Sequence, residues 1–341
     1  MFRRSLLASA IATGLLPASR AWAEALEATG AGSSFPNATI QKWIEMAQSA
    51  AGVSIKFDPI GSGGGQNKIM AGDTDFGVSE MPMPDEMKAN ANLIQFPISV
   101  GGVVCVANVP GLAANQLKLN GVLIAAIFSG QIKTWNDPRI AEINAGVTLP
   151  EMDIKPVYQR DLIGTTFVFT QYILAANADW REKFGPRITR RWAVGSNVDG
   201  NIFMGDTIKT VPGSIGYMDY NTAVKNNYPT VSLLNAAGKY VAPNPANFAA
   251  AAAAADWANA PAIVVSLINQ AGDNSWPITT PSYVQVPLEP KDPVRSQTVR
   301  KFFEFALTKG GSAATENNLI PLPEPAVKAS LAIWDKVKAT N

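Results

Sequence analysis

The sequence predicts an α/β protein, and three features indicate this class. Short runs of β-branched and aromatic residues alternate with segments whose apolar residues recur at helical spacing. An almost unbroken apolar run over residues 93–108 reads as two buried strands and suits a parallel sheet covered on both faces. Turns rich in Gly, Ser and Thr precede helical patterns at three places.

The chain begins with a segment typical of a secretory signal peptide. Arg3 and Arg4 precede a short apolar stretch, and Ala21-Trp22-Ala23 fits a cleavage site, so we expect a signal peptide over residues 1–23. The stretch is too short to span a bilayer, and no later segment is long and apolar enough. The arginine pair leaves the general and the twin-arginine export routes both open.

Composition argues against several kinds of active site. The 341-residue chain has no His, one Cys and a formal net charge of +1. Without His, the Ser-His-Asp and Cys-His catalytic groups and His-ligated zinc are excluded. The near-neutral charge argues against nucleic acid, and Cys105 lies in an apolar run typical of a buried residue. We therefore predict a binding protein, with neither cofactor nor metal, rather than an enzyme.

Two Gly/Ser turns lie near the mature N-terminus, and each precedes a helix. Residues 29–36 lead into a pattern typical of a helix, and the strand-like run 53–57 leads through Gly61–Gly65 into a short helix ending near Gly72. Unpaired amides and the helix dipole favour an anion at such ends. Taken alone, each turn is better explained by ordinary helix capping or by a strand-to-helix turn without a ligand.

The following segments continue the alternation. Residues 72–80 form a strand-like run ending in Glu80, which is either a surface charge or an acceptor at the ligand-binding edge of a sheet. Further strands are expected at 154–158, 211–217 and 276–280, and further helices within 117–132, from 135, through 169–173, and at 247–255, 299–309 and around 333–334.

The third turn-to-helix junction is Gly164-Thr165-Thr166, which follows the strand at 154–158. Three junctions that can converge indicate an anion site better than any one of them does.

The order of several motifs resembles that of the periplasmic phosphate-binding protein of the phosphate-specific ABC transporter. The resemblance extends over nearly the whole mature chain. The matching stretches are 29–36 (TGAGSSFP), 61–64 (GSGG), 75–79 (DFGVS), 95–104 (QFPISVGGVV), 108–112 (NVPGL), 130–135 (GQIKTW), 164–167 (GTTF), 212–217 (PGSIGY) and 276–279 (WPIT).

The resemblance implies a type II periplasmic-binding-protein fold, in which two α/β domains enclose a ligand cleft. Domain I would comprise residues 24–107 and 281–341, and domain II residues 108–280. Carried over to this sequence, the residues donating to the oxyanion are Ser34, the Phe35 amide, Ser62, Gly164 and Thr165. Glu80 occupies the position of the family's pocket aspartate, and Asp161 that of the acid which orients its binding arginine.

The departures from the family pattern fall at the ligand. Gln159 stands at the position of the arginine, with Arg160 one residue later, and Leu162-Ile163 replaces a Gly-Ser pair. Loss of a charged hydrogen bond predicts phosphate binding weaker by about ten- to a hundred-fold. Either Arg160 shifts into the site, or the ligand is less negative than phosphate.

We predict a periplasmic, monomeric solute-binding protein that captures phosphate and delivers it to a membrane ABC transporter permease. A protonated oxyanion suits Glu80 as proton acceptor, which favours phosphate over sulfate. The alternatives are a divergent paralogue that binds another small oxyanion or a less charged ligand, and a ligand-sensing protein.

Overall fold

A mixed sheet of eight strands organises the part of the chain that the structure describes. The computed structural model describes residues 27–159, 163–177, 182, 192–257, 259–260 and 264–338. In spatial order the strands are β2 (Ile55–Asp58), β1 (Ala28–Gly32), β3 (Phe76–Ser79), β11 (Thr279–Pro287), β4 (Leu93–Ala107), β8 (Ser214–Asp219), β6 (Lys155–Gln159) and β7 (Ser196–Val198). A smaller sheet contains β10 (Tyr240–Val241), β9 (Ser232–Leu234) and β5 (Lys118–Leu119). The α/β class is confirmed.

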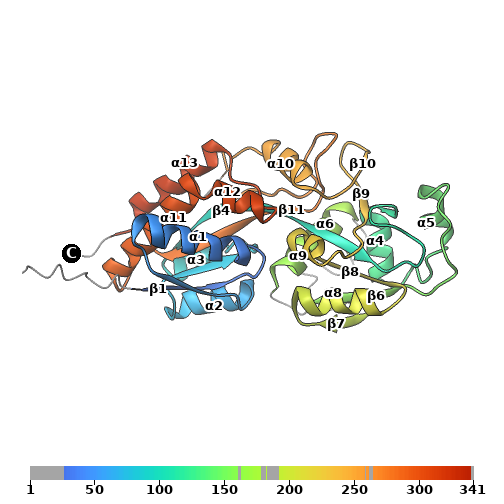
Figure 1. The fold of residues 1–341 in the computed structure, drawn as a ribbon, viewed down its shortest axis with the longest axis horizontal. Helices are drawn as coiled ribbons and strands as arrows, with labels where there is room; N and C mark the ends of the chain where they lie inside the picture. Colours follow the sequence, from blue (N-terminus) through green and yellow to red (C-terminus); the bar gives the residue numbers. More distant parts are fainter. Residues whose placement is uncertain are drawn as a thin grey trace, which may run out of the picture.

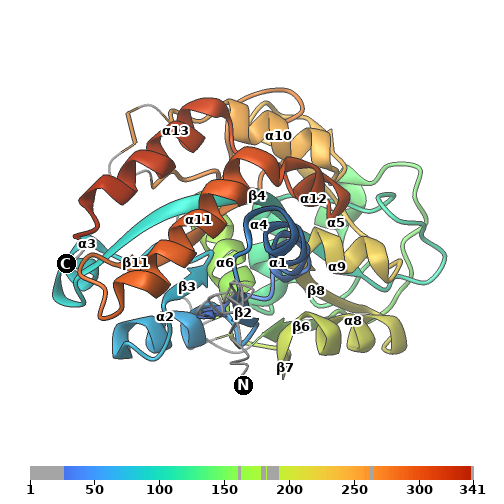
Figure 2. The same ribbon diagram turned by 60° about the vertical axis from the view of Figure 1, so that its left-hand side comes forward.

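Helices cover this sheet in two groups (Figure 1). The first group packs around β1, β2 and β3, and the second around β6 and β8. The helices are α1 (Asn37–Ala51), α2 (Ser62–Ala71), α3 (Asp85–Asn90), α4 (Gly121–Phe128), α5 (Pro138–Ile143), α6 (Gly164–Ala176), α8 (Gly200–Thr210), α9 (Tyr220–Lys225), α10 (Pro245–Ala253), α11 (Pro293–Lys309), α12 (Gly311–Glu316), α13 (Glu324–Ala332) and the 3₁₀ helix η2 (Ile333–Lys336). In Figure 2, α1 and α11 lie side by side over the first group of strands.

The long strand β4 connects the two groups of strands. Its first part, from Leu93 to Gly102, pairs with β11, and its last part, Val103–Ala107, pairs with β8. Both pairings are antiparallel, so the expectation of a parallel sheet at residues 93–108 is wrong. A strand buried on both faces has the same apolar pattern whichever way its neighbours run, which is why the sequence misleads here.

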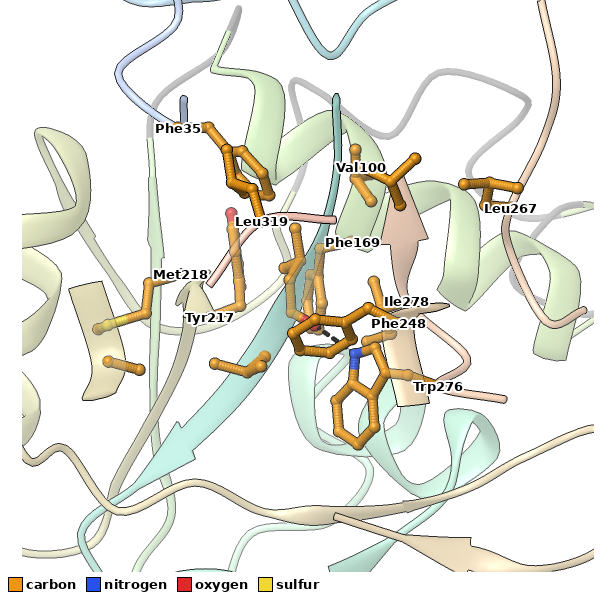
Figure 3. Packing of buried hydrophobic residues seen from close by; sticks show 14 of the residues in the cluster. Phe35, Val100, Phe169, Tyr217, Met218, Phe248, Leu267, Trp276, Ile278 and Leu319 are labelled. Atoms are coloured by element: carbon orange, nitrogen blue, oxygen red, sulfur yellow. Dashed lines mark hydrogen bonds between the residues drawn. The ribbon is translucent and has the colours of Figure 1, made fainter. Parts of the chain in front are cut away.

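Residues 93–107 also form one strand rather than the two that we predicted within 93–108, and Gly101 and Gly102 lie inside it. A Cβ at Gly101 would lie 2.6 Å from the Phe35 ring, and one at Gly102 would collide with the Phe248 ring. Both rings lie in the core of Figure 3, where the Trp276 indole N–H donates to the Val103 carbonyl oxygen at 2.8 Å. The glycines therefore make room for aromatic packing where the strand crosses the molecule.

Several predicted helices are confirmed, and their ends have identifiable causes. Helix α2 ends at Ala71 because Gly72 takes the left-handed conformation, with φ of 73°. Helix α11 starts earlier than the predicted 299–309, since the Asp292 carboxylate accepts the amides of Val294 and Arg295 and Pro293 fits the first turn. Cys105 is fully buried in β4, and burial raises the pKa of its thiol to about 12.

Candidate functional site

Glu80 lies at the centre of a cluster of serine hydroxyls. It follows β3 directly, and its side chain is buried, with 1% of the residue exposed. Its Oε2 accepts hydrogen bonds from Ser33 Oγ at 2.5 Å and Ser62 Oγ at 2.9 Å. Its Oε1 accepts one from Ser282 Oγ at 2.9 Å. The four residues come from the end of β1, the start of α2, the end of β3 and the middle of β11, so the site forms only when the sheet is assembled.

The Glu80 carboxyl group is shielded from solvent. Burial raises its pKa above the ordinary value, and the hydrogen bonds from Ser33, Ser282 and Ser62 act against that shift. Among the described residues, no Lys or Arg forms a salt bridge with it. Hydroxyl hydrogens therefore take the place of a countercharge for Glu80 in the described part of the chain.

The N-termini of α2 and α6 meet at this cluster. Ser62 is the first residue of α2, and a Cβ at Gly164, the first residue of α6, would collide with Glu80 Oε2 and Ser62 Oγ. Neither helix has a side chain that caps its first amides. Unpaired amides and the positive end of the helix dipole favour negative charge at both ends.

Ile163 packs where the two groups of elements meet. A Cβ at Gly61, the residue before α2, would lie 3.4 Å from Ile163 Cδ1. The apolar side chain that stands where the family has a hydroxyl donor thus lies close to the turn before α2. An isoleucine side chain cannot donate a hydrogen bond to a ligand there.

Gln159 belongs to a buried network on β6 and β8. Its Nε2 donates to Asn201 Oδ1 at 2.6 Å and to the Tyr217 carbonyl oxygen at 3.3 Å, which uses both amide hydrogens. Its Oε1 accepts from Thr165 Oγ1 at 3.4 Å. Asn201 donates in turn to the carboxylate of Asp219. The side chain is 1% exposed, and it positions Thr165 and Asn201 with no donor left over for a ligand.

Asp219 ends this network. Burial raises the pKa of its carboxyl group, while hydrogen bonds from Thr222 and Asn201 oppose that shift. The same carboxylate caps α9 by accepting the Thr222 amide at 2.8 Å. The network is therefore anchored to the start of α9.

The structure brings only some of the predicted site residues together. Ser62, Glu80 and Gly164 come together, and Thr165 follows at the start of α6. Ser34 is exposed and makes no hydrogen bond with Glu80, and the Phe35 amide donates to Ser33 Oγ at 3.1 Å. Asp161, together with Arg160 and Leu162, lies outside the described residues.

The sequence interpretation missed Ser33 and Ser282. Ser33 is adjacent to Ser34, the predicted site residue. Which of the two serines faces the site depends on the folded backbone. Ser282 reaches the site through strand pairing, because Tyr283 lies opposite Ser79 in the antiparallel pair of β11 and β3. One step further along that register places Ser282 beside Glu80, and no local sequence signal indicates it.

The hydrogen-bond count at Glu80 limits what the site can bind. An ionised carboxylate offers about four acceptor positions, and three serine hydroxyls already use three of them. Because a hydroxyl has a single hydrogen, Ser33 and Ser62 cannot donate to a ligand at the same time as to Glu80. A backbone hydrogen bond at Glu80 itself also lowers the pKa of the carboxyl group. Oε1 accepts from one serine and Oε2 from two, so Oε1 is the oxygen better placed to accept from a ligand that carries a proton.

Two other classes of site find no support in the described residues. No group of three or more His, Cys, Asp or Glu side chains there could hold a metal ion. Within the same ranges, the helices all fall short of the length and apolar character needed to cross a membrane.

Comparisons with known proteins agree on one family. Residues 18–309 match the model of the PBP superfamily domain. The phosphate-binding protein PstS of Pasteurella multocida is 40% identical over 314 residues, which cover 92% of this chain and 91% of that protein. PstS of Haemophilus influenzae is 37% identical, covering 94% of this chain and 95% of that protein.

Solved structures show the same fold at lower identity. A high-affinity periplasmic phosphate-binding protein, PfluDING, solved with bound phosphate, aligns with a TM-score of 0.70 and 20% identity, covering 91% of this chain and 93% of that one. A phosphate-binding protein of Stenotrophomonas maltophilia aligns with a TM-score of 0.68 and 18% identity, covering 90% and 93%.

Proposed function

The chain belongs to the PstS family of phosphate-binding proteins within the PBP superfamily, and on that premise we propose that it captures inorganic phosphate where α2, α6 and Glu80 meet. Its relatives in this family are named as binding proteins, and this chain is likewise a binding protein rather than an enzyme. The observation that carries the proposal is the position of Glu80, buried among three hydroxyls at the start of two helices.

In this proposal, phosphate is held by amides and by one proton of its own. The first amides of α6, at Gly164 and Thr165, and the exposed hydroxyl of Ser34 donate to its oxygens. Glu80, through Oε1, accepts the P–O–H hydrogen. Sulfate has no proton to donate at neutral pH, so it would bring a negative charge against Glu80 without a hydrogen bond.

Gln159 acts in the proposed site as a positioning residue. It accepts from Thr165 and donates to Asn201, so it fixes the start of α6 without neutralising a ligand charge. Replacing an arginine by this neutral side chain removes a charged hydrogen bond, which predicts affinity lower by about ten- to a hundred-fold than a site with arginine would give.

Delivery to an ABC importer completes the proposed function. A signal peptide over residues 1–23 would direct the chain to the periplasm, where it would work as a monomer. Domain I (24–107 and 281–341) and domain II (108–280) would close on phosphate and present it to the membrane permease. The long strands β4 and β11, each of which runs close to a proposed domain boundary, support this division.

Isothermal titration of the phosphate-stripped protein tests the proposal. We expect saturable binding of phosphate and of arsenate, which has the same shape and protonation, and no heat from sulfate. The Glu80→Gln variant should lose discrimination against sulfate, because a neutral amide no longer repels it. Absence of binding heat with both phosphate and arsenate would rule out phosphate as the ligand and favour a less charged one.

A further inference from the structure

A mostly apolar cavity of about 180 Å³ adjoins the proposed phosphate site. Glu80 is one of its lining residues, so the cavity and the hydroxyl cluster share a wall. Phe167 and Val168 line it from α6, one turn beyond Gly164. A helix rises about 5.4 Å per turn, so the cavity begins roughly that far from the amides proposed to hold phosphate.

The residues that line the cavity are held by hydrogen bonds, and most of them carry no charge. Tyr283 on β11 accepts the Val265 amide at 3.2 Å and donates to the Val265 carbonyl oxygen at 3.1 Å, which ties the lining segment 264–268 to the sheet. The hydroxyls of Thr279 and Thr280 both donate to backbone carbonyls. Among the described lining residues, Glu80 is the one ionisable group besides the Tyr283 phenol.

We propose that this cavity receives the organic substituent of a phosphonate or phosphate monoester whose oxyanion occupies the phosphate site. The inference rests on the proposed function and deepens it by naming the ligand class. Such a ligand keeps a protonatable oxygen for Glu80 and turns its apolar group toward Phe167, Val168 and Leu267. Apolar cavities of roughly 150 Å³ accommodate a benzene-sized group, so a phenyl substituent falls within the space available.

Titration with ligands of graded length tests this directly. The probes are inorganic phosphate, then methyl-, ethyl-, propyl- and phenylphosphonate, with methyl phosphate to separate the ester linkage from the P–C bond. Each methylene that enters the cavity should tighten binding by about fourfold. Equal affinities along the series would put the substituent in solvent, and binding of phosphate alone would show the cavity closed to ligands; either result overturns the inference.

A pair of variants on α6 provides the matched control. Gln171 lines the cavity and is half-buried, so Gln171→Trp should fill the space and weaken propyl- and phenylphosphonate at least tenfold while phosphate binding stays unchanged. Ala175 lies exposed on the same helix outside the cavity, and Ala175→Trp should leave all the affinities unchanged. Unchanged phosphonate binding in Gln171→Trp would contradict the proposal.

The same titrations separate failure of the inference from failure of the proposed function. Phosphate binding without phosphonate binding rejects the cavity as a subsite and keeps the proposed function. Phosphonate binding without phosphate binding keeps the subsite and rejects phosphate as the ligand. Loss of both rejects both.

Discussion

Glu80 is stabilised at its position by hydroxyl groups, each of which supplies one hydrogen. This arrangement differs from an ion pair, because neutral donors reduce the cost of burying a carboxylate without cancelling its charge. The ionised group therefore keeps a field that acts on any anion bound nearby. Glu80 is the residue at which the choice between protonated and unprotonated oxyanions would be made.

The raised pKa of Glu80 predicts a specific dependence of stability on pH. A carboxyl group that binds its proton more tightly when folded stabilises the protein fully at low pH, and this contribution is lost as pH rises from the ordinary carboxyl range through the raised pKa. In Glu80→Gln that part of the dependence should disappear. Urea unfolding of both proteins at about pH 5 and about pH 8 measures it. Parallel changes in the two proteins would mean that Glu80 does not titrate in this range.

Ser33 and Ser34 are adjacent, yet the structure predicts that replacing them by alanine has different effects on the free energy of unfolding. Ser33→Ala deletes a donor to a buried carboxylate and should lower the free energy of unfolding by about 1.5–3 kcal/mol where Glu80 is ionised. Ser34→Ala removes an exposed hydroxyl and should stay within about 0.5 kcal/mol of the parent. Urea unfolding compares the stabilities and titration the affinities. If Ser34→Ala weakens phosphate without loss of stability, it is a ligand contact.

At the level of elements, the start of α6 must come very close to Glu80. A Cβ at Gly164 would overlap Glu80 Oε2 and Ser62 Oγ, so Gly164→Ala should push α6 away from α2 and weaken phosphate binding at least tenfold. Gly311→Ala is the matched control at the first residue of α12, where a Cβ would lie 3.7 Å from the nearest atom, of Pro321. Titration and small-angle X-ray scattering would compare them. Equal affinities would show that the contact between α6 and Glu80 does not matter for binding.

The elements differ in how well the sequence predicts them, and the difference has physical causes. Helices such as α1 and α6 are indicated by periodicity and by the turns before them, which are local features. Strand β4 is not predicted correctly, because its continuity through Gly101 and Gly102 depends on Phe35 and Phe248, which are distant in the sequence and occupy the space beside these glycines. Direction of pairing is likewise invisible in a strand buried on both faces.

The site follows the same division between local and distant information. Ser62, Glu80 and Gly164 lie at junctions that the sequence marks, so they could be named without a structure. Ser282 depends on the register of β11 against β3 and on a chain separation of 202 residues from Glu80. The hydrogen bonds from Gln159 to Asn201 and Tyr217 could not be predicted either, since the sequence around a glutamine does not indicate its hydrogen-bond partners.

At the scale of the whole molecule, β4 and β11 belong to one sheet that spans both groups of elements. Because β4 pairs with β11 and then with β8, neither half can lose its strands without exposing part of the other. We therefore expect the protein to unfold in a single cooperative transition. Calorimetry would show one peak, and two peaks would contradict the prediction.

Phosphate should shift that single transition, because a ligand that binds only the folded chain stabilises all of it. At a concentration about 100 times the dissociation constant the gain is about 2.7 kcal/mol, which corresponds to a rise of several degrees in the melting temperature for a chain of this size. Sulfate at the same concentration should leave the melting temperature unchanged, since it offers Glu80 no proton. In Glu80→Gln the two anions should act more alike, because the repulsion that distinguishes them is gone. An equal shift by both anions in the parent protein would mean that discrimination does not depend on the proton accepted by Glu80.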